Sequence, residues 1–133
     1  MMQASAVWSD HERFIGKASS GHAIVVDAAT EKTANSPMEL VLIGLCGCTA
    51  YDVVNILSKK REPFTSLRVQ AEAERAPSPP SVFNRIELTY TVGGKVTPKA
   101  MEDAVQLSEE KYCSVAAMLS KTAKITYKIV YLE

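Results

Sequence analysis

The fold depends on the stretch SPMELVLIGLCGCTAYDVVNIL, residues 36–57, which has the pattern of one long helix. Ser36 suits the N-cap, Pro37 suits the first helical position, and Glu39 completes a capping box with Ser36. Beyond the first turn the stretch is apolar on nearly every side, and a helix of that kind must be buried all round. Because one sheet of a 133-residue chain can cover only one side, we expect a second copy of the chain to cover the other.

Upstream of this helix, the residue pattern predicts three strands joined by tight turns. The three segments are residues 3–8, 12–18 and 22–27. The last of them is rich in β-branched residues, and Ser19-Ser20-Gly21 before it is a turn signal. We therefore expect an N-terminal antiparallel meander.

Downstream of the long helix, the pattern predicts two strands, two helices and a last strand. Polar and apolar residues alternate, as in half-exposed strands, over residues 67–74, 86–92 and 125–131. The two helices are expected over residues 97–111 and 114–121. The order βββ-α-ββ-αα-β predicts an α+β fold whose sheet is mainly antiparallel, in a single domain over residues 1–133.

Charge and hydropathy argue against some classes of partner. Lys plus Arg and Asp plus Glu each total 15, so no broad basic face is expected to attract nucleic acid. The longest stretch without an ionisable acid or base lies between Glu39 and Asp52, which is too short for a membrane span. The N-terminus lacks the basic start and apolar core of a signal peptide. We therefore expect a cytoplasmic protein whose three cysteines are reduced at rest.

The cysteines are the residues most able to carry chemistry. Cys46 and Cys48 are two residues apart on the predicted helix, so their side chains point about 200° apart and cannot easily pair or share one metal. A buried cysteine can also be merely a small hydrophobe, which we expect of Cys46. Cys113 falls at a predicted helix start, where free amides and the helix dipole favour a thiolate. The two histidines lack the spacing of a zinc site, so no metal or other cofactor is expected.

The segment from Ser36 to Cys48 resembles the Asn-Pro-Glu-x-Leu…Cys stretch of the OsmC/Ohr family, the osmotically inducible and organic hydroperoxide resistance proteins. Cys48 falls eleven residues after Pro37, as in the family pattern. The later Glu110-Lys-Tyr-Cys113-Ser-Val-Ala resembles the region of the family's second cysteine. The resemblance covers nearly the whole chain and is closest to a less-studied bacterial OsmC-like branch. It implies an intertwined homodimer with the long helices packed centrally.

The resemblance also implies an activity, that of a thiol peroxidase in oxidative stress defence. Cys48 would attack an organic hydroperoxide and become a sulfenic acid. Cys113 would resolve this acid to a Cys48–Cys113 disulfide, which a small or protein-bound dithiol then reduces. Apolar residues around Cys48 suit an alkyl group better than hydrogen peroxide.

A mid-helix thiolate needs a cation nearby, and the resemblance implies an Arg held by the Glu directly after the proline. Arg13 is the best match for this Arg, with Lys17 as a rival, and Arg13 could equally be an exposed strand residue. Here Met38 follows the proline, and the acid is Glu39, one residue later and about 100° around the helix. Capping is the expected role of Glu39, and anchoring the Arg is the alternative.

A second function stays open at this point. The chain could be a non-catalytic OsmC-like protein that holds an apolar ligand at the dimer interface. Met38 at the usual glutamate position favours this alternative, whereas the pair of Cys48 and Cys113 favours the peroxidase.

Overall fold

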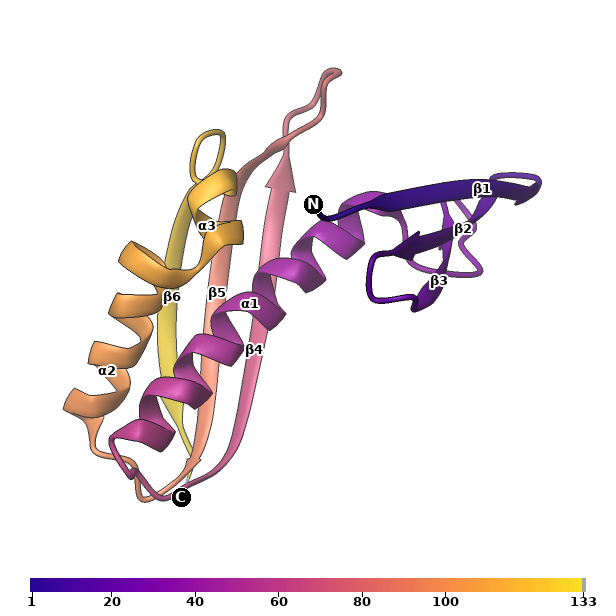
Figure 1. The fold of residues 1–133 in the computed structure, drawn as a ribbon. Coiled ribbons are helices and arrows are strands. Elements are labelled where there is room, and N and C mark those ends of the chain that lie inside the picture. Colours follow the sequence, from indigo (N-terminus) through magenta and orange to yellow (C-terminus); the bar gives the residue numbers. More distant parts are fainter. Residues whose placement is uncertain (133) are drawn as a thin grey trace. The chain divides into compact units, whose positions relative to one another are not determined.

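A computed structural model describes residues 1–132, and its elements follow the predicted order with one addition (Figure 1). The elements are β1 (Ala4–Asp10), β2 (Arg13–Ala18), β3 (Ala23–Asp27), α1 (Pro37–Lys59), β4 (Phe64–Arg75), β5 (Phe83–Gly94), α2 (Pro98–Leu107), η1 (Ser108–Tyr112), α3 (Ser114–Leu119) and β6 (Lys124–Tyr131). The α+β class is therefore confirmed. The addition is η1, a π-helical turn that replaces the last turn of the helix expected over residues 97–111.

The chain forms two compact units, one from Met1 to Ile43 and one from Gly44 onward, and α1 runs through both. The first unit is the predicted meander, an antiparallel sheet in the order β1-β2-β3. The turn before β3 closes as its sequence indicates, because the amide of Gly21 donates to the carbonyl of Ala18 at 2.9 Å and Gly21 has a φ of +84°. The expectation of a single domain over residues 1–133 stays a prediction.

The connector after β3 is closed by one buried carboxylate. Asp27 accepts hydrogen bonds from the amide of Ala29 at 2.9 Å, the amide of Thr33 at 2.9 Å and the hydroxyl of Thr33 at 2.7 Å. These bonds favour the charged form and lower the pKa of Asp27 to about 2. The carboxylate thus holds the loop that leads into α1.

The start of α1 has the capping box that its sequence predicts. The amide of Ser36 donates to the Glu39 carboxylate at 2.8 Å, and the amide of Glu39 donates to the Ser36 hydroxyl at 3.2 Å. The backbone bond from Ser36 also lowers the pKa of Glu39. The capping role of Glu39 is confirmed, and it occupies the carboxylate with its own helix end.

The second unit is a three-stranded sheet in the order β4-β5-β6, with α1, α2 and α3 against one face (Figure 1). β4 pairs with β5 antiparallel, while β6 pairs with β5 parallel because α2, η1 and α3 carry the chain back across the sheet. The fully buried residues recur every second position on β5 and every fourth position on α1. They are Ile86, Leu88, Tyr90 and Val92 on β5 and Leu45, Thr49, Val53 and Leu57 on α1.

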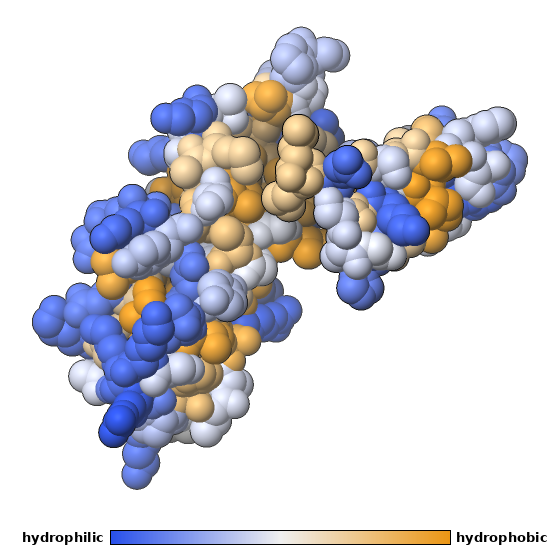
Figure 2. Space-filling model, in the orientation of Figure 1, coloured by the Kyte–Doolittle hydropathy of each residue, from blue (hydrophilic) through white to orange (hydrophobic). Residues whose placement is uncertain are grey.

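The rest of α1 remains open within one chain. Ile43 and Tyr51 are 54% and 68% exposed, and Val41 and Val54 also reach the surface. Figure 2 shows apolar residues at the surface of each unit. By length and composition alone α1 could cross a membrane, a test that a soluble protein's core helix also passes. The prediction that this stretch is too short for a membrane span does not hold for the helix, because α1 extends beyond both Glu39 and Asp52.

The bonds to Asp27 predict an acid-sensitive stability. Because folding lowers the pKa of this carboxyl, its stabilisation is complete above the unfolded value near 3.8 and is lost as the pH falls towards 2. We expect Asp27→Asn to lower the midpoint of urea unfolding at pH 7, as measured by circular dichroism. We also expect the variant to lose less stability than the natural chain between pH 4 and pH 2. Glu31→Gln, in the same loop, is the control and should behave as the natural chain. An unchanged acid profile in Asp27→Asn would contradict this reading of the loop.

Candidate functional site

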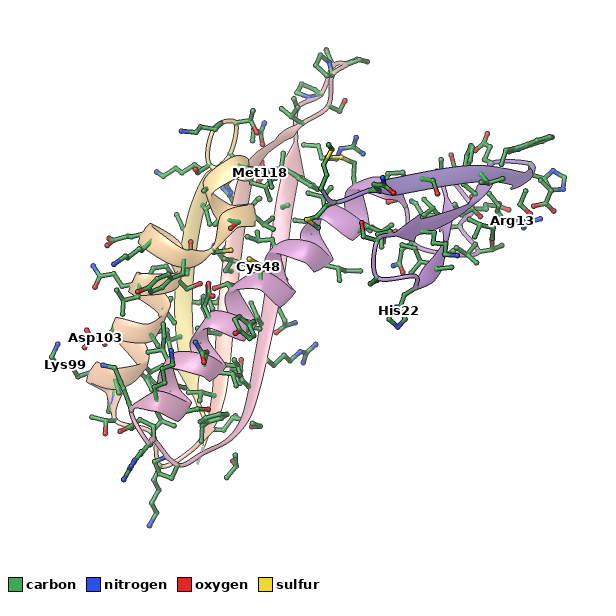
Figure 3. All side chains as sticks on the ribbon, in the orientation of Figure 1. Arg13, His22, Cys48, Lys99, Asp103 and Met118 are labelled. Atoms are coloured by element: carbon green, nitrogen blue, oxygen red, sulfur yellow. The ribbon has the colours of Figure 1, made fainter. Side chains whose placement is uncertain are left out.

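The structure brings together the two cysteines that the sequence singles out. Cys48 lies on α1, and Cys113 is the residue directly before α3 (Figure 3). Neither thiol is in a disulfide, and the two lie near enough for Cys48 to raise the pKa of Cys113. Cys48 is half-buried and Cys113 is 3% exposed. They are 65 positions apart in sequence, so it is the packing of α1 beside η1 and α3 that creates the pair.

Cys113 does not have the acidic thiol that its helix-start position suggests. Its sulfur accepts a hydrogen bond from the amide of Ala116 at 3.4 Å, as an N-cap does. Burial nevertheless raises the pKa of Cys113 more than this amide lowers it, and the neighbouring Cys48 thiol and Asp52 carboxylate raise it further. The expectation of a favoured thiolate is therefore wrong, and Cys113 is a protonated thiol at neutral pH.

Cys46 differs from this pair in position and surroundings. It is half-buried on α1, and burial alone raises its pKa. It stands two residues before Cys48, so on the helical period its side chain points away from that of Cys48. Its role as a small hydrophobe stays a prediction.

Asp52 is a site residue that the sequence argument missed. It follows Cys48 by four residues on α1, so both project from one side of the helix. Its carboxylate accepts a hydrogen bond from the Ser108 hydroxyl at 2.9 Å and contributes to the high pKa of Cys113. The four-residue spacing was a usable signal, because it sets a carboxylate beside any thiol at position 48.

A buried group of hydroxyls continues from Asp52 into the core. The Thr49 hydroxyl lies 2.7 Å from both the Ser108 hydroxyl and the Tyr90 phenol oxygen. The Tyr90 phenol oxygen in turn lies 2.8 Å from a carboxyl oxygen of Glu109. Burial raises the pKa of both Tyr90 and Glu109. No local pattern predicts this group, since its members come from α1, β5 and η1.

The π-helical turn η1 supplies two of these side chains. The amide of Cys113 donates to the carbonyl of Ser108 at 2.8 Å, five residues back instead of four. The turn sets the Ser108 hydroxyl against Thr49 and Asp52 and the Glu109 carboxylate against Tyr90. Such turns within helices are frequent at functional sites.

A groove of about 480 Å³ runs along α1 in the second unit. It is lined by Tyr51, Asp52, Asn55, Ile56, Lys59, Lys60, Leu107 and Tyr112. Asp52 therefore belongs both to the wall of this groove and to the surroundings of Cys113. The aromatic and aliphatic members can contact an apolar group, and the volume is within the usual range for small-molecule sites.

Arg13 and Glu39 are both engaged elsewhere within the first unit. Arg13 on β2 forms a two-point ion pair with Asp10, at 2.8 Å from Nε and 2.7 Å from Nη2, and also reaches Thr33 at 3.4 Å. Lys17, its rival, is exposed on the same strand. Over residues 1–132 no hydrogen bond or ion pair joins Arg13 to Glu39. The roles of Arg13 and Glu39 towards Cys48 stay predictions.

Across residues 1–132 no three His, Cys, Asp or Glu side chains converge as metal ligands would. The chemistry available from the described residues is that of two adjacent thiols, one carboxylate and a buried hydroxyl group.

Comparisons with known proteins agree with the resemblance seen in the sequence. The family model described as "OsmC-like protein" matches residues 29–128. Protein YhfA of Escherichia coli K12 is 42% identical over 127 residues, which cover 95% of each chain.

Two solved structures extend this comparison. A hypothetical protein from Aquifex aeolicus VF5 is 33% identical, with a TM-score of 0.86 over 100% of this chain and 98% of that one. An organic hydroperoxide resistance protein from Elizabethkingia anophelis has a TM-score of 0.78 over 99% and 96% of the chains, and at 14% identity its likeness shows the fold alone. From the family match and the YhfA identity, we conclude that this chain belongs to the OsmC-like protein family.

Proposed function

We propose that the protein is a thiol peroxidase that reduces organic hydroperoxides in oxidative stress defence. The observation that carries this proposal is the proximity of the Cys48 and Cys113 thiols, which is close enough for Cys48 to raise the pKa of Cys113. The two cysteines come from distant segments of the sequence, and one is half-buried while the other is buried. The proposed disulfide would join them. A solved structure with the same fold is named an organic hydroperoxide resistance protein, which is why this reaction class is chosen for the proposal.

The proposed cycle has three steps. The Cys48 thiolate attacks the hydroperoxide, its O–O bond breaks, and Cys48 becomes a sulfenic acid while the alcohol takes up a proton. The Cys113 thiol then attacks the Cys48 sulfur, the disulfide forms, and the sulfenic hydroxyl leaves as water with the Cys113 proton. A small or protein-bound dithiol reduces the disulfide. The proximity of the two thiols favours the second step.

The groove along α1 is the proposed site for the organic part of the substrate. Its wall includes Asp52, one helical turn from Cys48, and continues through Ile56 to Leu107 and Tyr112. An alkyl or aryl group that lies there would leave its hydroperoxide near Cys48. This arrangement favours organic hydroperoxides over hydrogen peroxide, which has no apolar part to bind.

A homodimer in the cytoplasm is the proposed working form. The exposed apolar residues of α1 lie away from its buried stripe, as expected of a helix that a second copy covers. The three free cysteines suit a reducing compartment. Because an exposed ion pair contributes little net stability, Arg13 can leave Asp10 to serve a thiolate in the assembled protein.

One observation keeps the binding-protein alternative in view. Glu39 is hydrogen-bonded in its capping box, and Arg13 forms an ion pair with Asp10. Within residues 1–132, the two residues that would activate Cys48 therefore do not pair with each other. A protein that uses the same groove to hold an apolar ligand would need neither residue. Counting the thiols after cumene hydroperoxide is added to the reduced protein separates the two functions, since only the peroxidase loses two.

The proposed cycle predicts different outcomes for the three cysteines. Cys48→Ser abolishes the consumption of cumene hydroperoxide, because no other thiol lies beside Asp52 and Cys113 in the described structure. Cys113→Ser leaves one round of oxidation and a sulfenic acid that dimedone traps, as read by mass spectrometry. Cys46→Ala is the matched control and retains full activity. Loss of activity in Cys46→Ala alone would show that the wrong thiol was chosen.

The proposed dimer predicts a mass of twice 14.5 kDa in sedimentation at micromolar concentration. Val54→Lys on α1 weakens the dimer. The lysine ammonium would be buried at the interface without an ion-pair partner, which is unfavourable because it loses its hydration. Val130→Lys on β6, an equally exposed valine, is the control and leaves the dimer intact. A compact monomer of the natural chain would overturn the proposal.

The proposed role of Arg13 predicts a graded loss of oxidation rate. Arg13→Ala slows the oxidation of Cys48, and Arg13→Lys recovers only part, because a point charge lacks the planar fork of the guanidinium. Asp10→Asn frees Arg13 from its observed partner and leaves the rate unchanged or higher. Glu39→Gln lowers the melting temperature through its cap without slowing oxidation. An unchanged rate in Arg13→Ala shifts the role to Lys17 or the partner chain.

A further inference from the structure

Five side chains form one unbroken line of oxygen contacts in the core of the second unit. The line runs Asp52–Ser108–Thr49–Tyr90–Glu109, with oxygen separations of 2.9, 2.7, 2.7 and 2.8 Å. Thr49, Ser108 and Tyr90 are fully buried, so the line is closed to water along its middle. We call this set the hydroxyl chain.

The hydroxyl chain has more contacts than its hydroxyl groups can fill. Its four oxygen contacts need four protons, but three hydroxyls supply only three. With both carboxylates ionised, Ser108 donates to Asp52 and Tyr90 donates to Glu109. The single proton of Thr49 then serves one neighbour and leaves lone pairs facing each other at 2.7 Å on the other side. One additional proton on a terminal carboxyl would fill this contact.

Glu109 is the better holder of that proton. Burial raises the pKa of Glu109, whereas Asp52 lines the open groove. With Glu109 protonated, every donor points the same way, from Glu109 through Tyr90, Thr49 and Ser108 to Asp52. Each contact then has one proton, and each buried hydroxyl both donates and accepts. Outside its own members, the titratable side chains beside the chain are Cys113, which acts on Tyr90 and is acted on by Asp52, and Tyr127, whose ring packs edge-on against Tyr90.

We propose that the hydroxyl chain stores one proton and delivers it through Asp52 to the alkoxide that leaves when Cys48 attacks a hydroperoxide. This inference rests on the proposed peroxidase function for its delivery step and on geometry alone for its storage step. Asp52 is placed for delivery because it is one helical turn from Cys48 and lies in the groove wall. Asp52 would be the catalytic acid, and Thr49, Tyr90, Ser108 and Glu109 would be positioning residues.

The proton balance closes over one cycle. Oxidation of the Cys48 thiolate breaks the O–O bond and needs one proton for the alcohol, which empties the store. Disulfide formation needs none, because the proton of Cys113 leaves with the sulfenic hydroxyl as water. A dithiol brings two protons when it reduces the disulfide. One of them stays on Cys113, Cys48 leaves as a thiolate, and the other refills the store.

The storage step is tested without any peroxide, by infrared spectroscopy. We expect a carbonyl band of a protonated carboxylic acid at neutral pH that disappears in Glu109→Gln. Thr49→Val is the sharper variant, because removing the middle hydroxyl leaves two contacts and two protons, so both carboxyls can ionise. The band should therefore vanish in Thr49→Val although Glu109 is intact, and return in Thr49→Ser. A band that persists in Thr49→Val means that burial alone holds the proton, which overturns the proposal.

The delivery step is tested by single-turnover oxidation in a Cys113→Ser background. Asp52→Asn should slow the reaction with cumene hydroperoxide about 100-fold, the lower end of the range that general acids supply. Thr49→Val should slow it less, because Asp52 remains in place. Peracetic acid is the matched probe, because its acetate leaving group needs no proton, and its rate should be unaffected. Thr89→Val on β5 is the structural control and should leave both rates alone. Equal slowing of both peroxides by Asp52→Asn overturns the delivery step. If the Cys113→Ser protein is not oxidised at all, the peroxidase function is overturned, and the infrared test of proton storage is unaffected.

Discussion

The packing of α1 against the central strand β5 fixes every group in the candidate site. The helix buries one side chain every fourth position, from Leu45 to Leu57, against the inward residues of β5. Cys48 and Asp52 each stand one residue before a buried position, so they are turned by about 100° towards the segment of η1 and α3. A helix rotated by one residue would bury the thiol and expose Thr49. The apolar packing that stabilises the unit therefore also orients the Cys48 and Asp52 side chains.

The helices and strands could be predicted from the sequence because they depend on residues that are close together in the chain. Alternation of apolar residues predicted the strands, and Ser36, Pro37 and Glu39 predicted the helix start with its capping box. The pairing of Cys48 with Cys113 came from the family resemblance, since no spacing rule joins residues 65 positions apart. The resemblance itself depends on residues around the two cysteines, and the family match confirms it.

The remaining parts of the site depend on contacts that a single sequence does not encode locally. Thr49 meets Tyr90 from 41 positions away and Ser108 from 59 positions away. The protonation of Cys113 was wrongly predicted because a helix start was visible in the sequence while the depth of burial was not. The position of Arg13 relative to a turn does not indicate its partner in the structure. That partner is Asp10, which lies only three residues earlier in the sequence.

The π-helical turn η1 has a consequence for how such a site arises in evolution. A hydrogen bond that spans five residues instead of four accommodates one extra residue in the turn. The extra residue sets Ser108 and Glu109 against the core, while α2 ahead of it keeps its buried face. Loss of that residue would return an ordinary helix and disconnect Asp52 from Tyr90. Chemistry could be gained or lost within this family by a length change, with every residue of the sheet untouched.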